Sequence, residues 1–227
     1  MKTKYNIIEI FDSIEGEGKR AGAPATFIRL AGCNLRCAYC DTTYAMEGNY
    51  QTRDIDDILL QVKKGGFSRV TLTGGEPLTA PSVEVLIHQL LTCGNEVNIE
   101  TNGSIDVKYV LEYLESKVHD PARKLFFTMD YKLPSSGVTG NMLLSNFSVL
   151  RPWDVLKFVV GSQSDIEHMV DFLHSLTSQP QIYIGAVYEK YDYKKLVSAI
   201  LKTPELKDAK LQLQLHKIIW DPNERGV

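Results

Sequence analysis

The stretch CNLRCAYC, residues 33–40, contains three of the four cysteines in this 227-residue chain. Its spacing, C-x3-C-x2-C, gathers three thiols in one loop, and thiolates prefer soft metals such as iron–sulfur clusters, zinc and copper(I). A structural zinc site normally has four protein ligands in two pairs, and the sequence has no second cysteine pair. Three cysteines can instead bind three irons of a 4Fe–4S cluster and leave the fourth iron open to an external ligand. The stretch therefore predicts a reactive iron–sulfur centre, with the fold built around it.

Zinc bound by the three cysteines and one distant histidine is the alternative for the same stretch. The histidines available as a fourth ligand are His88, His119, His168, His174 and His216. That ligand would have to come from far along the sequence, unlike the closely spaced pairs of common zinc motifs. Under this alternative the protein would be an interaction module and not an enzyme.

The composition is that of a single globular domain spanning residues 1–227. The hydrophobic fraction is 44%, and a net charge of −3 indicates no general affinity for nucleic acid or an anionic membrane. No apolar run approaches the ~20 residues of a membrane span, and the amino terminus lacks the apolar core of a signal peptide. Clustered cysteines without such a signal favour the cytoplasm. The isolated Cys93 is expected to be a small buried side chain.

Hydrophobic periodicity predicts strands that alternate with helices. The expected strands are 5–11, 25–30, 69–73, 96–101, 125–131, 155–160, 181–187 and 210–215. The expected helices are 52–64, 81–92, 107–115, 142–150, 164–176 and 193–202. This alternation is typical of a parallel sheet with crossover helices. Because the unit recurs only about six times, the prediction is an α/β fold in the form of a partial, open βα barrel of about six parallel strands.

Polar loops follow several of these strands at their carboxyl ends. The cysteine loop follows the strand 25–30, and segments 74–76, 101–103 and 130–132 follow three others. The carboxyl ends of parallel strands meet at one edge of a sheet, so we expect these loops to converge on one site.

The cysteine spacing, with the aromatic Tyr39 before the last cysteine, resembles the radical S-adenosylmethionine (SAM) superfamily. The resemblance implies that Cys33, Cys37 and Cys40 hold a catalytic 4Fe–4S cluster whose open iron chelates SAM. It also implies that the reduced cluster cleaves SAM to a 5′-deoxyadenosyl radical, which takes a hydrogen from the substrate.

The segment Thr73-Gly-Gly-Glu-Pro77 resembles the second motif of that superfamily. There a glycine backbone can approach the methionine part of SAM, which a Cβ atom would prevent. The SAM-binding residues that the resemblance implies are Tyr39, beside the adenine, and Gly75, Glu76, Asp130, Tyr131, Lys132 and Lys157.

Five further segments resemble one family within the superfamily, the 7-carboxy-7-deazaguanine synthases. They are residues 14–18 (IEGEG), 27–35 (FIRLAGCNL), 40–42 (CDT), 212–216 and 220–227. The resemblance covers essentially the whole chain. It implies conversion of 6-carboxy-5,6,7,8-tetrahydropterin to 7-carboxy-7-deazaguanine with release of ammonia, on the route to queuosine and related 7-deazapurines. It also implies Mg2+, a homodimer and an external electron donor of the flavodoxin or ferredoxin type.

A pterin offers ring N–H and amino donors together with a carboxylate, and candidate partners for each are present. Glu15 and Glu17 can accept from the ring, and Arg29 can pair with the carboxylate. Family members often carry Gln at the position of Glu15, and only Gln can also donate. The further candidate substrate contacts are Ile14, Gly16, Thr73 and His216.

Thr42 is the residue that the resemblance makes a ligand of Mg2+. Mg2+ prefers oxygen ligands and keeps several waters, so a single protein ligand is sufficient. Asp41 could hold one of those waters.

A glycyl-radical activating enzyme is the main alternative within the superfamily, because it has the same cysteine spacing and a similar size. It would act on a polypeptide, so turnover of the pterin distinguishes the two. A brown, iron-containing protein after anaerobic reconstitution would distinguish both from the zinc module.

Overall fold

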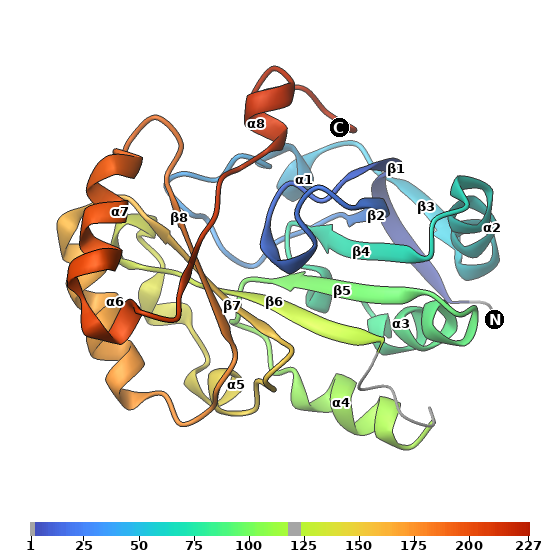
Figure 1. Cartoon of the computed structure of the whole chain (residues 1–227). Helices are drawn as coiled ribbons and strands as arrows, with labels where there is room; N and C mark the ends of the chain where they lie inside the picture. Colours follow the sequence, from blue (N-terminus) through green and yellow to red (C-terminus); the bar gives the residue numbers. More distant parts are fainter. Residues whose placement is uncertain (1–2, 118–123) are drawn as a thin grey trace.

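A computed structural model describes residues 3–117 and 124–227, and these residues form one nine-stranded sheet (Figure 1). Its strand order is β3-β1-β2-β4-β5-β6-β7-β8-β9. The strands are β1 (Lys4–Ile14), β2 (Pro24–Leu30), β3 (Gln51–Asp54), β4 (Arg69–Gly74), β5 (Glu96–Thr101), β6 (Leu125–Tyr131), β7 (Val155–Val160), β8 (Gln181–Ala186) and β9 (Lys210–Leu211).

The helices surround the outside of the curved sheet, apart from α1 and α8, which lie near each other at the top of Figure 1. They are α1 (Tyr44–Glu47), α2 (Ile55–Gly65), α3 (Val83–Thr92), α4 (Lys108–Glu115), α5 (Leu144–Ser148), α6 (Gln163–Ser175), α7 (Tyr193–Lys202) and α8 (His216–Ile219). None of the described helices is long and apolar enough to cross a membrane.

The sheet is parallel from β2 through β9, as the alternation of strands and helices predicts. Within the described residues β3 and β9 are the two edges and do not pair, so the barrel is open. The strands β1 and β3 are antiparallel additions at one edge. A short loop without a crossover helix joins β1 to β2, and such a loop permits only antiparallel pairing.

The alternation of side chains along the strands separates an inner face, which lines the cavity, from an apolar outer face. The outer face packs beneath the helices and includes Ile28, Leu72, Ile99, Met129 and Phe158, all of them buried in one hydrophobic core. The inner-face residues nearest the carboxyl ends are polar. They are Arg29, Thr73, Glu100, Asp130 and Lys157.

Most predicted elements are present, and the differences have local causes. The predicted helix 52–64 begins only at Ile55, because the preceding residues pair with β1 as strand β3. The helix α6 begins earlier than the capping signature at 164–167 suggested, because the Ser162 side chain caps it by accepting from the Asp165 N–H. Cys93, expected to be buried, is exposed just beyond α3.

Candidate active site

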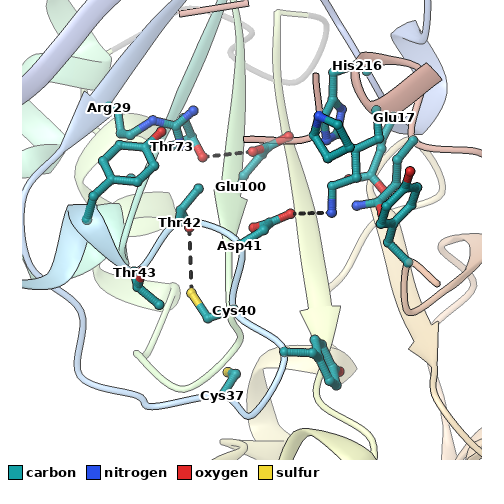
Figure 2. A pocket seen from close by; sticks show the side chains of 18 of the residues that line it. Glu17, Arg29, Cys37, Cys40, Asp41, Thr42, Thr43, Thr73, Glu100 and His216 are labelled. Carbon is teal, nitrogen blue, oxygen red and sulfur yellow. Dashed lines mark hydrogen bonds and ion pairs between the residues drawn. The ribbon is translucent and has the colours of Figure 1, made fainter. Parts of the chain in front are cut away.

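A cavity of about 610 Å3 opens at the carboxyl ends of the parallel strands. This volume lies within the usual range for a small-molecule site, which is about 300–1,000 Å3. Figure 2 shows Cys37 and Cys40 at one end of the view, with Arg29 and Thr73 on one side and Glu17 and His216 on the other. The predicted site residues that line it are Ile14, Gly16, Glu17, Arg29, Cys33, Cys37, Tyr39, Cys40, Thr42, Thr73, Gly75, Asp130, Lys132, Lys157 and His216.

The cysteine loop presents its three half-buried thiols to this cavity. Burial raises the pKa of the Cys33 and Cys37 thiols, so a bound metal would be needed to keep them as thiolates near neutral pH. The described residues hold no group of three or more His, Cys, Asp or Glu side chains gathered around one metal-ion position. Three ligands of a 4Fe–4S cluster bind three different irons, so a cluster does not require the thiols to meet at one metal-ion position. The Leu35 N–H also points to the Cys33 Sγ at 3.4 Å.

The Gly-Gly-Glu-Pro loop packs between the cysteine loop and the end of β5. A Cβ atom on Gly75 would lie 2.2 Å from the Gly32 carbonyl oxygen, so only glycine permits this approach. Glu76 is fully buried and does not reach the cavity. Its carboxylate accepts from the Leu78 N–H at 3.0 Å, the Thr101 hydroxyl at 2.9 Å and the Asn102 N–H at 2.6 Å.

In this structure the Glu76 oxygens join two loops, and its contact with SAM stays a prediction. Burial raises the pKa of Glu76 to about 7, and the hydrogen bonds from Asn102, Leu78 and Thr101 only partly offset that effect. The Glu76 carboxyl connects the loops, and this motif presents Thr73, Gly74 and Gly75 to the cavity.

Neighbouring residues of β6 point to opposite faces of the sheet. Asp130 lines the cavity and accepts from the Lys132 ammonium at 2.8 Å. Its Oδ1 atom is buried and has no hydrogen-bond partner among the described residues. Buried polar atoms normally have a partner, so a donor on a bound ligand would supply the missing hydrogen bond. Tyr131 faces outward, where its ring stacks on Phe172 at 3.9 Å between centroids. Strand alternation turns the Tyr131 side chain into the helix layer, and the predicted contact of this residue with SAM stays a prediction.

The cavity wall carries two hydrogen-bonded pairs of polar groups. Lys157 donates to the Glu17 carboxylate at 2.6 Å, and this pairing raises the pKa of the lysine despite the opposing effect of burial. The Thr73 hydroxyl donates to the Glu100 carboxylate at 2.8 Å (Figure 2). Burial and the charge of Glu15 raise the pKa of Glu100. Sequence patterns did not single out Glu100. Its position at the end of β5, two residues before Asn102, could have indicated it.

Glu15 lies below the cavity and does not line it. Its carboxylate, 1% exposed, accepts from the Arg20 guanidinium and from the Thr71 hydroxyl. Its predicted contact with the pterin ring stays a prediction, and its side chain does not line the cavity in this structure. The side chain is turned toward a buried cation in the barrel interior, because an unpaired carboxylate there would be costly.

The C-terminal segment after β9 closes one side of the cavity. The sequence did not predict the contacts that it makes there. The Leu215 N–H donates to the Gly16 carbonyl at 3.0 Å, and the Gln212 amide bonds both Glu17 and the Gly18 N–H. Burial lowers the pKa of His216, so this ring is favoured in its neutral form at the cavity wall.

An ion pair joins that segment to the cysteine loop. The Lys217 ammonium lies 3.0 Å from the Asp41 carboxylate (Figure 2). Burial alone would raise the pKa of Asp41, but the charge and hydrogen bond of Lys217 outweigh it and hold the pKa low. Asp41 is therefore ionised and paired with a cation, and the pair connects the C-terminal segment to the loop that carries Cys40.

Gly16 is required where His216 packs against it. A Cβ atom at position 16 would lie 2.2 Å from the His216 Nδ1. Gly16→Ala should displace the ring and lower the free energy of unfolding by about 1–3 kcal/mol, the usual cost of overpacking. Urea denaturation measures this loss, with Gly140→Ala as the control because a Cβ there meets nothing within 4 Å. Equal stabilities of the two variants would contradict the packing argument.

Comparison with known proteins agrees with this geometry. The radical SAM superfamily model matches residues 27–121. A 7-carboxy-7-deazaguanine synthase from Clostridium acetobutylicum is 42% identical over 98% of this chain and 99% of its own length. A protein of the same name from Methanospirillum hungatei is 37% identical over 95% of this chain and 86% of its own. The chain belongs to the 7-carboxy-7-deazaguanine synthase family.

The fold of this 7-carboxy-7-deazaguanine synthase family member also matches a solved structure. The crystal structure of QueE from Escherichia coli superposes with a TM-score of 0.74 at 24% identity, covering 93% of this chain and 94% of that one. Membership of the radical SAM superfamily implies a 4Fe–4S cluster and SAM as cofactors. Of the histidines that the structure describes, only His216 lines the cavity, and His119 lies outside the described residues.

Proposed function

We propose that this chain is a radical SAM enzyme that converts 6-carboxy-5,6,7,8-tetrahydropterin to 7-carboxy-7-deazaguanine and releases ammonia. The observation that carries the proposal is a single cavity with two chemically different ends. One end holds Cys33, Cys37 and Cys40, and the other holds polar groups suited to a pterin acid. This function serves the synthesis of queuosine and related 7-deazapurines, in which the product leads to a modified tRNA base.

The cofactor end uses the cysteine loop and the inner face of β6. When bound, the reduced cluster and SAM supply the radical that starts the reaction. We propose that Asp130 and Lys132 hold polar groups of SAM, with Tyr39 beside its adenine. The unpartnered Oδ1 of Asp130 supports this role. The backbone of Gly75 lies beside Cys33, so it can contact SAM next to the cluster.

The substrate end matches the donors and the charge of the pterin. Arg29 pairs with the carboxylate, since a guanidinium fork fits a carboxylate in two parallel hydrogen bonds. Glu17 and Glu100 accept from ring N–H and amino groups, and Lys157 and Thr73 hold these carboxylates in place. The backbone of Ile14 and Gly16 and the neutral ring of His216 complete the wall around the ring.

Turnover of the reconstituted protein tests this function. The protein is loaded anaerobically with iron and sulfide, then incubated with SAM, a chemical reductant and the carboxytetrahydropterin. We expect a brown protein that forms 7-carboxy-7-deazaguanine and ammonia in equal amounts. A brown protein that cleaves SAM but leaves the pterin unchanged would support an activating enzyme, and a colourless protein would support the zinc module.

We further propose that Thr42 binds Mg2+ together with the substrate carboxylate. The Thr42 hydroxyl lines the cavity beside Cys40, with 3.8 Å between Oγ1 and Sγ, and a hydroxyl oxygen suits Mg2+. Thr42→Ala should reduce the Mg2+-dependent gain in pterin affinity, whereas Thr42→Ser should keep most of it. Pterin titrations with and without Mg2+ measure the difference, and the iron–sulfur spectrum should stay unchanged. Equal behaviour of both variants would remove the hydroxyl from the metal site.

The remaining features of the proposal concern the whole protein. We propose that residues 1–227 act as one radical SAM domain, because one continuous sheet carries the site. The reducing cytoplasm suits three clustered thiols. An external flavodoxin- or ferredoxin-type donor would supply the electron, and the active form would be a homodimer by analogy with the family.

A further inference from the structure

Arg29, which we propose binds the substrate carboxylate, is itself bound by a carboxylate of the protein, that of Glu9. Glu9 on β1 and Arg29 on β2 are directly opposite each other in the antiparallel pair. The Arg29 Nε donates to the Glu9 Oε1 at 2.7 Å, and the two side chains are only 14% and 20% exposed. Within the part of the chain that the structure describes, Arg29 lines the cavity and Glu9 does not. Glu9 can therefore act on a ligand only through the residues that it contacts, of which Arg29 is the charged one.

A β-bulge in β1 creates this pairing. Ile7 is opposite Leu30, and the next pair is Glu9 with Arg29, so β1 contains one extra residue at Ile8. In a regular strand without the bulge, Ile8 would be opposite Arg29 and Glu9 would point to the other face, since each one-residue shift reverses the face of every side chain. Bulges commonly re-aim a side chain near a functional site.

The surrounding groups hold the Glu9 carboxylate in one position. The Tyr44 hydroxyl donates to the same Oε1 at 3.1 Å. The guanidinium carbon of Arg29 lies 5.8 Å from the ring centroids of Tyr44 and of Phe11. Arg225 from the C-terminal segment lies 3.9 Å from the Tyr44 ring centroid. Glu9 is thus fixed by two hydrogen bonds, and the Tyr44 ring that makes one of them is itself packed against Arg225.

We propose that Glu9 is a positioning residue that orients the Arg29 guanidinium for a carboxylate in the cavity. With the Nε–H engaged by Glu9, the donors left for a ligand are the two Nη groups at the end of the planar guanidinium. Their parallel N–H bonds form the fork that a carboxylate accepts. Holding that fork before the ligand arrives reduces the ordering cost of binding. This inference rests on the proposed function, because the ligand is the carboxylate of the tetrahydropterin.

Two pterins and four variants test the role. The wild type, Glu9→Ala, Glu9→Gln, Arg29→Ala and the double variant of Glu9→Ala with Arg29→Ala are reconstituted and loaded with SAM without reductant, so that binding is measured without turnover. Each is titrated with 6-carboxytetrahydropterin and with 6-methyltetrahydropterin, which lacks the carboxylate. Glu112→Ala, an exposed carboxylate on α4, is the matched control.

We expect Glu9→Ala to weaken binding of the acid about tenfold and to leave the methyl compound unchanged. Arg29→Ala should weaken acid binding by roughly one to two powers of ten. Glu9→Gln should stay within about threefold of wild type, because its amide oxygen still accepts from Nε. Adding Glu9→Ala to Arg29→Ala should cause no further loss, since the two residues act through one contact.

Three outcomes would overturn the inference while leaving the function intact. They are an unchanged affinity of Glu9→Ala for the acid, an equal loss for both pterins, and additive losses in the double variant. Each would make Glu9 a structural partner in the sheet. If the wild type bound neither pterin, the proposed function would fail, and this inference would fail with it.

Discussion

Replacing Cys33, Cys37 or Cys40 by Ala should reduce SAM cleavage to background, the largest effect we expect from any substitution. Each cysteine is the proposed ligand of one iron, and the cavity offers no nearby thiol in its place within the described residues. A missing ligand leaves an iron open to water and oxidation, so the cluster should not assemble in a reducible form. Iron content, visible absorption and formation of 5′-deoxyadenosine measure the loss.

Cys93→Ala is the matched control, because this thiol is exposed at the end of α3 and does not line the cavity. It should leave iron content and SAM cleavage at wild-type values. A cluster that survived Cys33→Ala but was lost in Cys93→Ala would show that the ligands had been assigned to the wrong residues.

Arg20→Ala should lower the free energy of unfolding by about 3–5 kcal/mol, the usual cost of removing one partner from a buried ion pair. The side chains of Arg20 and Glu15 are 7% and 2% exposed, so the remaining carboxylate would be left without its cation in the barrel interior. Arg20 also donates to the Thr71 hydroxyl and to the Glu96 carbonyl. Urea denaturation of equally reconstituted proteins measures the loss.

Arg69→Ala provides the comparison, because Arg69 and its partner Glu96 are each about two-fifths exposed. Exposed pairs contribute at most about 1 kcal/mol, so this variant should stay close to wild type. If Arg20→Ala were no less stable than Arg69→Ala, the Glu15–Arg20 pair would not be a structural support of the cavity floor.

The sequence by itself determined the chemistry of one end of the site and the class of fold. Cysteine spacing is local, so the position of the cluster could be predicted without any tertiary information. Hydrophobic periodicity is also local, and most strands and helices lie within a few residues of their predicted bounds. Because parallel strands place their carboxyl ends together, the convergence of the loops followed from the element order alone.

Only the tertiary structure decided which side chain of each motif faces the cavity. Asp130 and Tyr131 are neighbours, yet strand alternation places one in the site and the other beneath helix α6. Glu15 and Glu17 look alike in the sequence, but Arg20 draws the first into the barrel interior, while Lys157 holds the second at the cavity.

Local sequence patterns also could not predict contacts between residues that are distant in the sequence. The ion pair between Lys217 and Asp41 joins residues that are 176 positions apart in the sequence. The contact between Glu9 and Arg29 depends on a one-residue bulge, which no sequence periodicity marks. Side-chain direction and buried charge pairing depend on the whole packed sheet, because the cost of an unpaired buried charge is set by all of its neighbours.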